Sequence, residues 1–569
     1  MPCGICAGSL INLLKGINLM KEYLKNFKEI FEREYTWCEG FMRNVRRFSK
    51  KSALFFPETE QSWSYGELNA EANRMSNALL AAGVKPGDVV MFQLLNCPVF
   101  AFAYIAAHKI CATAAPVNYR LSSGEIAVTI DDSEPAVFIY DAEQEDVICE
   151  ALEMARHKPK IVIMTDIYRK KSAPAGHITY EQLTENAPDT EPKVDHTPSI
   201  YDETTRLFTS GTTGKPKGVP LTSINEVLSA HDIMIHFPLN HTDVTLNTTP
   251  WFHRGGLHCG GPTPTFYAGG TIIIMRKFNA RLCLQYAEKY HLTYIVGVPA
   301  VLEQLTETQL REGRDLSSLR GIVTMGSPLE RAACIRYQEV LTPNIFNGYG
   351  TTESLWNTFL RPFDLPERAG TAGGACVDDD ARVVKIFDDR KGEPDELCEQ
   401  NDIEVGEVII KAPAKSPYCY SDNPEETAKK YYKDYLYTGD LATWDTDGYI
   451  TICGRKDDMI ISAGENIYPT QVEEVLNSCP KVADCIVTAA PDKARGEVVT
   501  AYVVRADMSL TYEELEIFCR ESPMIANYKR PRYYRFVSEI PMNMTGKKLH
   551  YRAREMAAED LMNGLLYRV

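Results

Sequence analysis

Short, unbroken runs of strand-forming apolar residues most constrain the fold of this chain. Runs without polar alternation are typical of a parallel sheet that is covered on both faces. They occupy residues 136–141, 161–166, 271–275, 294–299 and 321–326. Helix-like segments separate them: in residues 64–82, Ser64 and Glu67 match a capping box, and apolar residues follow with helical spacing. The N-terminal bulk of the chain is therefore predicted to be α/β.

The pattern changes after about residue 405, where shorter strand-like runs begin. These runs cover residues 407–411, 449–456, 485–492 and 498–504, and helical segments near 470–478 and 511–520 separate some of them. This arrangement is typical of a small α+β domain. The expected fold is thus α/β: a large, multi-layer N-terminal domain with mixed or parallel sheets, followed by a small, mobile α+β domain.

Composition and charge exclude several classes of protein. Hydrophobic residues make up 44% and charged residues 24% of the 569 residues, as in a globular protein with a large core. The formal charge of −16 argues against a broad nucleic-acid surface or an anionic-membrane coat. Sixteen scattered cysteines fit a reducing compartment better than a disulfide scaffold. We therefore expect a cytoplasmic protein without nucleic-acid partners.

No transmembrane segment is predicted. The most apolar stretch, residues 89–117, is interrupted by polar residues and is expected to be a buried helix. Residues 1–30 are interpreted as an N-terminal extension, with amphipathic character as an open alternative. Cys3 and Cys6 form one CxxC pair without a second pair, which is weak evidence for a metal or redox role. The role of the extension and the oligomeric state are left open.

Residues 207–222, LFTSGTTGKPKGVPLT, concentrate hydroxyl, glycine and lysine side chains. Glycines let backbone N–H groups converge, hydroxyls add donors and lysines add charge, which together favour a polyphosphate cradle. The candidate residues are Thr209, Ser210, Gly211, Thr212, Thr213, Gly214, Lys215 and Lys217. The spacing is not that of a Walker A loop, and Pro216 prevents a helix from starting directly after Lys215. A flexible surface loop is the alternative.

This segment closely resembles the phosphate-loop signature of the adenylate-forming acyl-CoA synthetases, the superfamily that includes firefly luciferase and the adenylation domains of peptide synthetases. Three further motifs of the family follow in order: NGYGTTES at 347–354, YLYTGDLATWDTDGYITICGRKDDMIISAGENIYP at 435–469 and PMNMTGKKL at 541–549. The resemblance covers residues from about 30 to 560. It implies an extension over 1–30, a large domain over 31–455, a hinge at 456–458 and a C-terminal lid over 459–569.

The resemblance makes NGYGTTES the adenine and magnesium motif. It implies that the nucleotide is bound by Asn347, Gly348, Tyr349, Gly350, Thr351 and Thr352. Glycines on both sides of Tyr349 free an aromatic face to stack on a base, Thr352 offers a hydroxyl to a phosphate, and the Glu353 carboxylate suits Mg²⁺. A GxGxxG dinucleotide fingerprint fails because Glu353 takes the place of the third glycine. Without the family match, an ordinary loop is an equally good interpretation.

In residues 435–469, Asp440 follows a Thr-Gly turn, where its carboxylate can accept both ribose hydroxyls. The resemblance implies a second ribose contact at Arg455 and a hinge residue at Asp457. It also implies that Gly464 and Glu465 line the path of the coenzyme A thiol. Taken alone, either residue fits a surface ion pair better than a ribose contact.

In residues 250–256, PWFHRGG, His253 takes the family's aromatic-gate position, where it could orient the carboxylate or gate the pantetheine path. The resemblance implies an acyl pocket lined by Trp251, His253, Gly256, Val298, Gly326 and Trp356. Met325 replaces the first glycine of a family turn, which changes the expected shape of this pocket. Two tryptophans beside glycines favour a compact aromatic, alicyclic or medium-chain acid over a long-chain fatty acid.

The implied activity is an AMP-forming acid–thiol ligase. A carboxylic acid, ATP and coenzyme A yield acyl-CoA, AMP and pyrophosphate through an acyl adenylate, in a reversible reaction. Lys547, with His253 and Thr352, is the expected catalytic group, because its ammonium offsets repulsion between the carboxylate and the α-phosphate. Lys547 could instead be a solvated C-terminal lysine; replacement of the adjacent Lys548 with alanine is expected to leave acyl-AMP formation and thioester formation nearly intact. The alternative is a free-standing adenylation enzyme that loads a carrier protein.

Overall fold

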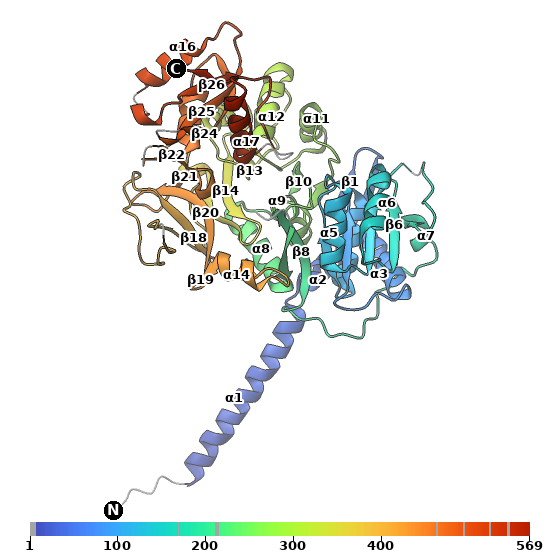
Figure 1. Ribbon diagram of the computed structural model, residues 1–569. Coiled ribbons are helices and arrows are strands. Elements are labelled where there is room, and N and C mark those ends of the chain that lie inside the picture. Colours follow the sequence, from blue (N-terminus) through green and yellow to red (C-terminus); the bar gives the residue numbers. More distant parts are fainter. Residues whose placement is uncertain are drawn as a thin grey trace, which may run out of the picture. The chain divides into compact units, whose positions relative to one another are not determined.

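The computed structural model describes the chain except for residues 1–6, 169, 211–215, 388, 463–464, 493–494, 523–524 and 543–546. The chain forms two compact units (Figure 1). The first comprises Met1–Phe278 with Ala414–Pro424, and the second comprises Asn279–Pro413 with Glu425–Val569. The hinge predicted at 456–458 lies within the second unit and stays a prediction.

A seven-stranded sheet forms the centre of the first unit. Its order is β7-β6-β5-β3-β4-β8-β9, and every pair is parallel except the antiparallel pair of β8 and β9. The strands are β3 (Val89–Gln93), β4 (Thr113–Pro116), β5 (Val137–Asp141), β6 (Ile161–Thr165), β7 (Ile178–Thr179), β8 (Glu203–Ser210) and β9 (Pro216–Thr222). The apolar runs at 136–141 and 161–166 are thus two adjacent parallel strands, β5 and β6.

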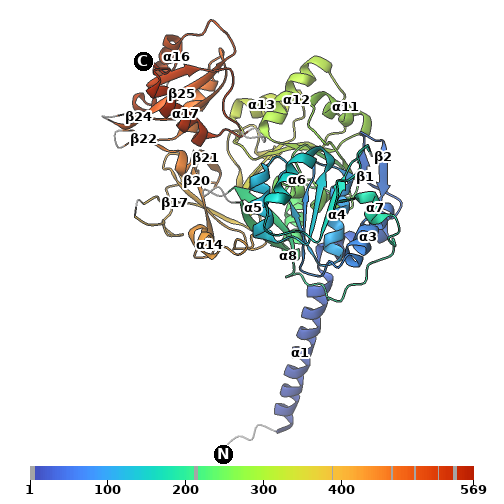
Figure 2. The same ribbon diagram turned by 45° about the vertical axis from the view of Figure 1, so that its right-hand side comes forward.

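Helices cover both faces of this sheet, as the unbroken runs predict. On one face, Met91, Phe138 and Tyr140 pack with residues of α5 (Ser123–Ser133) and α6 (Glu145–Met154), which lie side by side in Figure 2. On the other face, Val90 and Ile139 pack with residues of α3 (Tyr65–Ala81) and α4 (Pro98–Lys109). Successive residues of one strand therefore enter different cores, because side chains alternate along a strand.

Two local expectations can be checked here. The capping box is confirmed: the Ser64 side chain accepts from Glu67 N, and the Glu67 carboxylate accepts from Ser64 N. The stretch 89–117 is not a single buried helix, however. It contains β3, the fully buried α4 and β4, since Pro98 starts the helix and Ile110 ends it.

The other elements of the first unit complete its layers. Four strands have the order β10-β11-β1-β2 and comprise β1 (Ser52–Phe56), β2 (Gln61–Ser64), β10 (Val244–Asn247) and β11 (Thr271–Ile273). The remaining helices are α1 (Ala7–Glu34), α2 (Trp37–Phe48), α7 (Tyr180–Thr184), α8 (Ser223–His236), α9 (Arg254–His258) and α10 (Pro262–Ala268). β11 corresponds to the apolar run at 271–275.

The second unit begins with a mixed run of strands. β12 (Tyr294–Gly297), β13 (Gly321–Met325) and β14 (Ile345–Thr351) are parallel, and β15 (Leu355–Leu360) and β16 (Gly374–Ala375) continue antiparallel. Helix α11 (Ala280–Tyr290) precedes β12, α12 (Pro299–Glu312) connects β12 to β13, and α13 (Arg331–Val340) connects β13 to β14. An antiparallel sheet follows, made of β17 (Asp380–Val384), β18 (Gly406–Lys411), β19 (Tyr431–Tyr432), β20 (Tyr435–Trp444) and β21 (Ile450–Arg455). The short helix α14 (Pro424–Lys430) precedes β19.

The C-terminal sheet of the second unit has its own hydrophobic core. It contains β22 (Ile460–Ser462), β23 (Glu465–Ile467), β24 (Val482–Asp492), β25 (Gly496–Arg505), β26 (Tyr533–Phe536) and β27 (Tyr567–Arg568). Helices α15 (Pro469–Asn477), α16 (Tyr512–Glu521) and α17 (His550–Met562) accompany it. The α/β fold with mixed sheets and a separate C-terminal α+β region is confirmed. Among the described residues, no helix is both long and apolar enough to span a bilayer.

Candidate active site

Asp440 is the centre of a polar corner built by three strands of the second unit. β20 and β21 pair antiparallel, and their register sets Asp440 opposite Arg455. Arg455 Nη1 donates a hydrogen bond of 2.8 Å to Asp440 Oδ1, and the Tyr349 hydroxyl, from β14, donates one of 2.7 Å to Oδ2. Burial and the Asp440 carboxylate raise the pKa of Tyr349 well above its ordinary value, so the phenol keeps its proton. The two residues predicted for the ribose thus lie together, joined by a residue of the adenine motif.

Lys547 lies near this corner. Desolvation lowers the pKa of its ammonium, the positive charge of Arg455 lowers it further, and the carboxylates of Asp440 and Asp458 act in the opposite direction. Charges influence one another in this way only over short separations. The C-terminal lysine and the predicted ribose residues therefore share one region of the second unit, although about a hundred positions separate Lys547 from Asp440 in the sequence.

The glycines of the 347–354 motif have a structural reason that the sequence did not reveal. A Cβ atom on Gly350 would lie 1.6 Å from the Leu355 carbonyl oxygen, and one on Gly348 would lie 2.5 Å from the Trp356 ring. Because neither glycine has a side chain, the antiparallel strand β15 and its residue Trp356 can lie directly against β14. Trp356, predicted for the acyl pocket, is only 2% exposed and packs on Gly348.

The rest of this motif lies on β14 and in the turn that follows it. Asn347 is buried on β14, and the Thr351 and Ser354 hydroxyl oxygens lie 3.2 Å apart. Thr352 and Glu353 occupy the turn between β14 and β15, where Glu353 is 8% exposed. A hydroxyl and a buried carboxylate therefore stand at adjacent positions of one tight turn.

The predicted phosphate loop connects the antiparallel strands β8 and β9 of the first unit. Thr209 pairs with Lys217, and Ser210 pairs with Pro216. Lys217 is buried, with its ammonium 5.7 Å from the centre of the Tyr420 ring. Gly211, Thr212, Thr213, Gly214 and Lys215 lie outside the described residues. A strand–loop–strand hairpin differs from the strand–loop–helix of a Walker A site, in agreement with the spacing argument.

His253 stands directly before α9 and is partly buried. Its ring lies against Phe252, with 4.1 Å between the ring centres. Desolvation, followed by the charge of Arg120, lowers the pKa of His253 to about 4, so the imidazole is neutral at neutral pH. A neutral imidazole can offer one N–H donor without adding charge.

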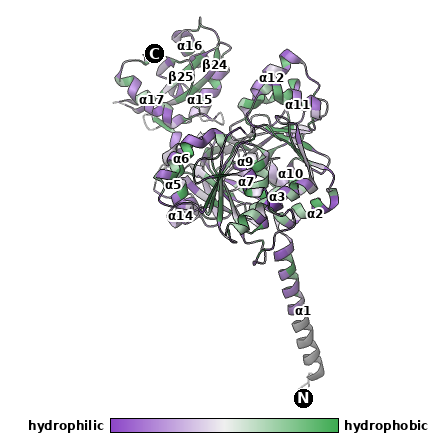
Figure 3. Ribbon diagram, turned by 90° about the vertical axis from the view of Figure 1, so that its right-hand side faces the viewer, coloured by the Kyte–Doolittle hydropathy of each residue, from purple (hydrophilic) through white to green (hydrophobic). Residues whose placement is uncertain are grey.

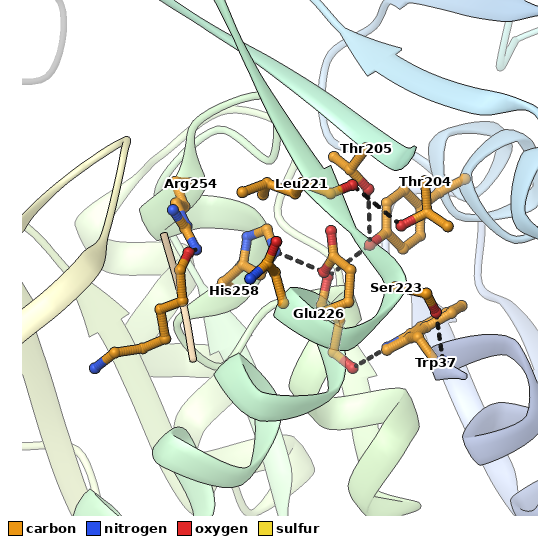
Figure 4. Close-up of polar contacts among 12 residues, drawn as sticks. Trp37, Thr204, Thr205, Leu221, Ser223, Glu226, Arg254 and His258 are labelled. Atoms are coloured by element: carbon orange, nitrogen blue, oxygen red, sulfur yellow. Dashed lines mark hydrogen bonds and ion pairs between the residues drawn. The ribbon is translucent and has the colours of Figure 1, made fainter. Parts of the chain in front are cut away.

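A buried contact between Glu226 and His258 anchors the helix that begins next to His253. Figure 4 shows Glu226, from α8, pointing at His258, at the end of α9; His258 Nε2 lies 2.7 Å from Glu226 Oε2, and neither side chain is exposed. Burial opposes the ionisation of Glu226, but the charge and hydrogen bond of His258 outweigh it and lower the Glu226 pKa to about 2. At the other end of α9, Arg254 Nη2 donates to the Lys415 carbonyl over 2.7 Å. These contacts fix the helix and, with it, the residue that precedes it.

The remaining acyl-pocket candidates fall in both units, and each is described within its own. In the first unit, Trp251 is fully buried in the core against Phe100, and a Cβ on Gly256 would lie 1.9 Å from the Pro250 carbonyl oxygen. In the second unit, Gly326 has a φ of +82°, and a Cβ there would meet Val298 at 3.6 Å. Gly256 and Gly326 are thus glycines for reasons of backbone packing and conformation.

The hinge and thiol-path candidates lie at the start of the C-terminal sheet. Asp457 is in a 3-10 turn over Lys456–Asp458, and its carbonyl accepts from Arg554 Nη1 over 3.3 Å. Glu465 begins β23, while Gly464 lies outside the described residues, as do Cys3 and Cys6.

A buried carboxylate that the sequence analysis missed lies next to the C-terminal lysine motif. Glu473, on α15, accepts from His550 Nε2 over 2.8 Å and from Val487 N over 2.8 Å, and Lys548 Nζ lies 3.4 Å away. Lys548 also pairs with Asp484 at 3.1 Å. Lys548 therefore belongs to a charge cluster around Glu473, and the expectation that its replacement leaves both half-reactions nearly intact stays a prediction. Position 473 adjoins the apolar positions 472, 475 and 476, which is the signal that could have marked it as buried.

Comparison with known proteins agrees with this geometry. The model of the AMP-binding enzyme family matches residues 41–417, and that of the AMP-binding enzyme C-terminal domain matches residues 471–547. The chain belongs to the AMP-binding enzyme family. The adenylate-forming superfamily that its motifs indicated is thereby confirmed.

Relatives and solved structures cover nearly the whole chain. An indoleacetate–CoA ligase of Aromatoleum aromaticum is 30% identical over 89% of this chain and 95% of its own length. A fatty acid–[acyl-carrier-protein] ligase, ScoC of Streptomyces coeruleorubidus, is 32% identical over 86% and 91%. The structure of o-succinylbenzoate coenzyme A synthetase (MenE) from Bacillus subtilis, in complex with ATP and magnesium ion, is similar with a TM-score of 0.77 and 27% identity, over 90% of this chain and 98% of that one.

These matches establish the enzyme class of this protein. It is a ligase of the AMP-forming acyl-CoA synthetase type, which acts through an acyl adenylate with ATP, coenzyme A and a carboxylic acid as substrates. The family match does not distinguish among acids.

Proposed function

We propose that this AMP-forming ligase activates a compact aromatic, alicyclic or medium-chain acid at the corner formed by Asp440, Arg455 and Lys547. The proposal is supported by the hydrogen bonds of Arg455 and Tyr349 to Asp440, together with the electrostatic interaction of Lys547 with Asp440 and Arg455. Adenylation brings a carboxylate onto a phosphate of the same charge sign. A cation beside the nucleotide offsets that repulsion as the two groups approach.

In the proposed first half-reaction, a carboxylate oxygen of the acid attacks the α-phosphorus of ATP, and the bond to the β-phosphate oxygen breaks to release pyrophosphate. Asp440 accepts hydrogen bonds from the ribose hydroxyls, and Lys547 neutralises charge on the carboxylate and α-phosphate. Thr209 and Lys217 flank the loop that holds the other phosphates. In the second half-reaction, the thiol of coenzyme A attacks the acyl carbonyl and AMP leaves.

Glu353 is the proposed magnesium ligand. Its carboxylate is buried in the turn after β14, next to the Thr352 hydroxyl, and hard oxygen atoms of this kind suit Mg²⁺. When bound, Mg²⁺ neutralises phosphate charge. The similar MenE structure, in complex with ATP and magnesium ion, supports the use of Mg²⁺.

His253 is the proposed positioning group for the acyl carboxylate. Its imidazole is neutral because burial lowers its pKa to about 4, so it can donate a hydrogen bond to a carboxylate without competing with Lys547 as a charge. The buried pair of Glu226 and His258 would fix the position of α9, and therefore also the position of His253 directly before it. Gating of the pantetheine path by His253 is the second possibility that the same placement allows.

Two features support a compact acid. Met325 and Val298 stand at the ends of neighbouring parallel strands, and their side chains occupy space that a glycine would leave open. The indoleacetate ligase among the relatives acts on an aromatic acid by its name. The fatty acid–[acyl-carrier-protein] ligase favours a second candidate, the loading of a carrier protein with a fatty acid.

A panel of acids tests the substrate class. Purified protein with ATP and Mg²⁺ is assayed for AMP release with benzoate, indoleacetate, cyclohexane carboxylate, octanoate and palmitate, each with coenzyme A and with a pantetheinylated carrier protein. We expect activity with the compact acids and coenzyme A, with overlapping rates because one methylene discriminates by only about 1–3 kcal/mol. A clear preference for palmitate would overturn the substrate class, and a preference for the carrier would favour the second candidate.

We also propose that residues 456–458 act as a hinge between the two half-reactions. Structures of the protein with an acyl-adenylate analogue and with coenzyme A should then differ by a rotation about Asp457. Identical placement of residues 459–569 in both complexes would contradict the hinge.

A further inference from the structure

The described part of α1 carries a long exposed apolar face. Along this helix, Met20, Leu24, Phe27 and Phe31 are 62%, 60%, 65% and 36% exposed. α1 extends away from the rest of the first unit (Figure 1), and the coloured part of the helix in Figure 3 carries both hydrophobic and hydrophilic residues. Contiguous exposed apolar residues on this scale mark an interaction surface.

The spacing of these residues is that of a coiled-coil seam. Positions 20, 24, 27 and 31 follow the alternating steps of four and three that make a 3.5-residue repeat. The sequence continues the same spacing towards the N-terminus with Leu10, Leu13 and Ile17. In the heptad abcdefg, residues 10, 17, 24 and 31 take position a, and residues 13, 20 and 27 take position d. All seven are apolar over three and a half heptads. A strict 3.5 repeat is the signature of a helix that pairs with another helix, whereas burial against a flat surface requires only a 3.6 period.

Charge argues against a lipid surface as the partner. In residues 20–34 the basic side chains are Lys21, Lys25, Lys28 and Arg33, and the acidic ones are Glu22, Glu29, Glu32 and Glu34. With Lys15, the helix Ala7–Glu34 carries five positive and four negative charges, and a net charge of +1 is too small to attract anionic headgroups strongly. Two ion pairs, Lys25–Glu29 at 3.8 Å and Lys28–Glu32 at 3.6 Å, join charged groups along the helix itself.

We propose that α1 pairs with α1 of a second copy of this chain as a parallel coiled coil. The e positions are Lys21 and Lys28, and the g positions are Tyr23 and Ile30. In a parallel pair e faces g, so each lysine meets an uncharged residue, whereas an antiparallel pair sets e against e and opposes lysines.

The length of the seam decides the area available. Because Met20, Leu24, Phe27 and Phe31 are 36–65% exposed, pairing buries only part of the ~150–250 Å² of each aromatic side chain. A specific interface of ~1,200 Å² therefore requires the whole repeat from Leu10 to Phe31. The stacked rings of Phe27, Phe31 and Tyr35, with centres 5.8 and 4.9 Å apart, present this surface as a rigid strip.

Sedimentation of the full-length protein at micromolar concentration tests the pairing. We expect a dimer, and we expect the double variant Leu24→Glu with Phe27→Glu to raise the dimer dissociation constant about 100-fold or more, because each chain then carries two charges in the seam. The matched control, Asn18→Glu with Asn26→Glu, adds the same charge at positions b and c and should remain dimeric. Both variants should keep ligase activity, which shows that the chain has folded.

Cross-linking tests the orientation. Met20→Cys and Phe27→Cys, made separately, should each form a chain-to-chain disulfide under mild oxidation, because d positions meet their own copies in a parallel pair; Lys25→Cys should not exceed the unsubstituted protein. A monomer in sedimentation, a dimer that survives the seam variant, or binding of the monomer to vesicles of anionic and zwitterionic lipid through the same residues would each overturn the proposal.

Discussion

The Tyr349 hydroxyl donates its hydrogen bond to the same carboxylate, Asp440, that Arg455 holds from the other side. Each donor takes a different oxygen of that carboxylate. Asp440 is only 7% exposed, so its orientation depends on these two partners more than on water. A residue expected to stack on adenine thus also sets the geometry of the residue expected to bind ribose.

Replacing Tyr349 with Phe should weaken nucleotide binding. A hydrogen bond to a charged group contributes about 1.5–3 kcal/mol, so the KM for ATP is expected to rise ~10–100-fold while kcat changes much less. The matched control is Tyr435→Phe, which removes a 2.6 Å hydrogen bond between a tyrosine and a carboxylate, Asp380, in the sheet that contains Asp440. Initial rates at varied ATP concentration measure both variants. An unchanged KM in Tyr349→Phe would show that Asp440 does not need this donor.

Lys547→Ala should separate the two half-reactions. If the ammonium stabilises the adenylation transition state, its removal costs ~3–4 kcal/mol, or a 10²–10³-fold loss in the rate of acyl-AMP formation. Thioester formation from supplied acyl-AMP should be largely retained. Pyrophosphate exchange and thioester assays measure the two steps, with the exposed Arg552→Ala as control. Equal damage to both steps would mean a structural role for Lys547.

Lys548→Ala should lower stability, because it leaves the Glu473 carboxylate, nearly buried, with fewer positive partners. A loss of about 1–3 kcal/mol in the free energy of unfolding is expected, with partial rescue in Lys548→Arg. Lys529→Ala is a matched control, since Lys529 Nζ donates over 2.9 Å to the neutral side chain of Gln471, which lies on the same helix as Glu473. Urea unfolding compares them. A Lys548→Ala variant as stable as the parent protein would contradict the role assigned to this cluster.

Acid should destabilise the first unit through His108 and His253. Burial lowers the pKa of each to about 4, whereas the unfolded chain titrates near 6.5. Below pH 6.5 both histidines become protonated in the unfolded state, whereas in the folded state they stay neutral until about pH 4. The free energy of unfolding should therefore fall as pH drops through this window, by up to ~3 kcal/mol per histidine. Urea unfolding between pH 7 and 4 measures the slope, and His108→Gln should reduce it; an unaltered slope in that variant would count against the assignment.

The sequence by itself determined the local elements and the family. Ser64 and Glu67 could be assigned to a capping box because their partners are three positions apart, and the apolar runs at 136–141 and 161–166 could be assigned to buried strands because burial on both faces removes polar alternation. Hydrophobic spacing fails where breakers divide one apolar stretch, as Pro98 divides residues 89–117 into a strand, a helix and a strand.

Only the tertiary structure decided which side chains meet. Tyr349 and Asp440 are 91 positions apart, and Lys548 and Glu473 are 75 apart, so their pairing depends on strand register and helix placement rather than on local propensity. The same holds for Gly348 and Gly350, which the sequence assigned to nucleotide contact and which admit β15 and Trp356. Capping and periodicity act between neighbours in the chain. Hydrogen bonds in a site join residues that are neighbours only after the strands have paired, and no local pattern carries that information.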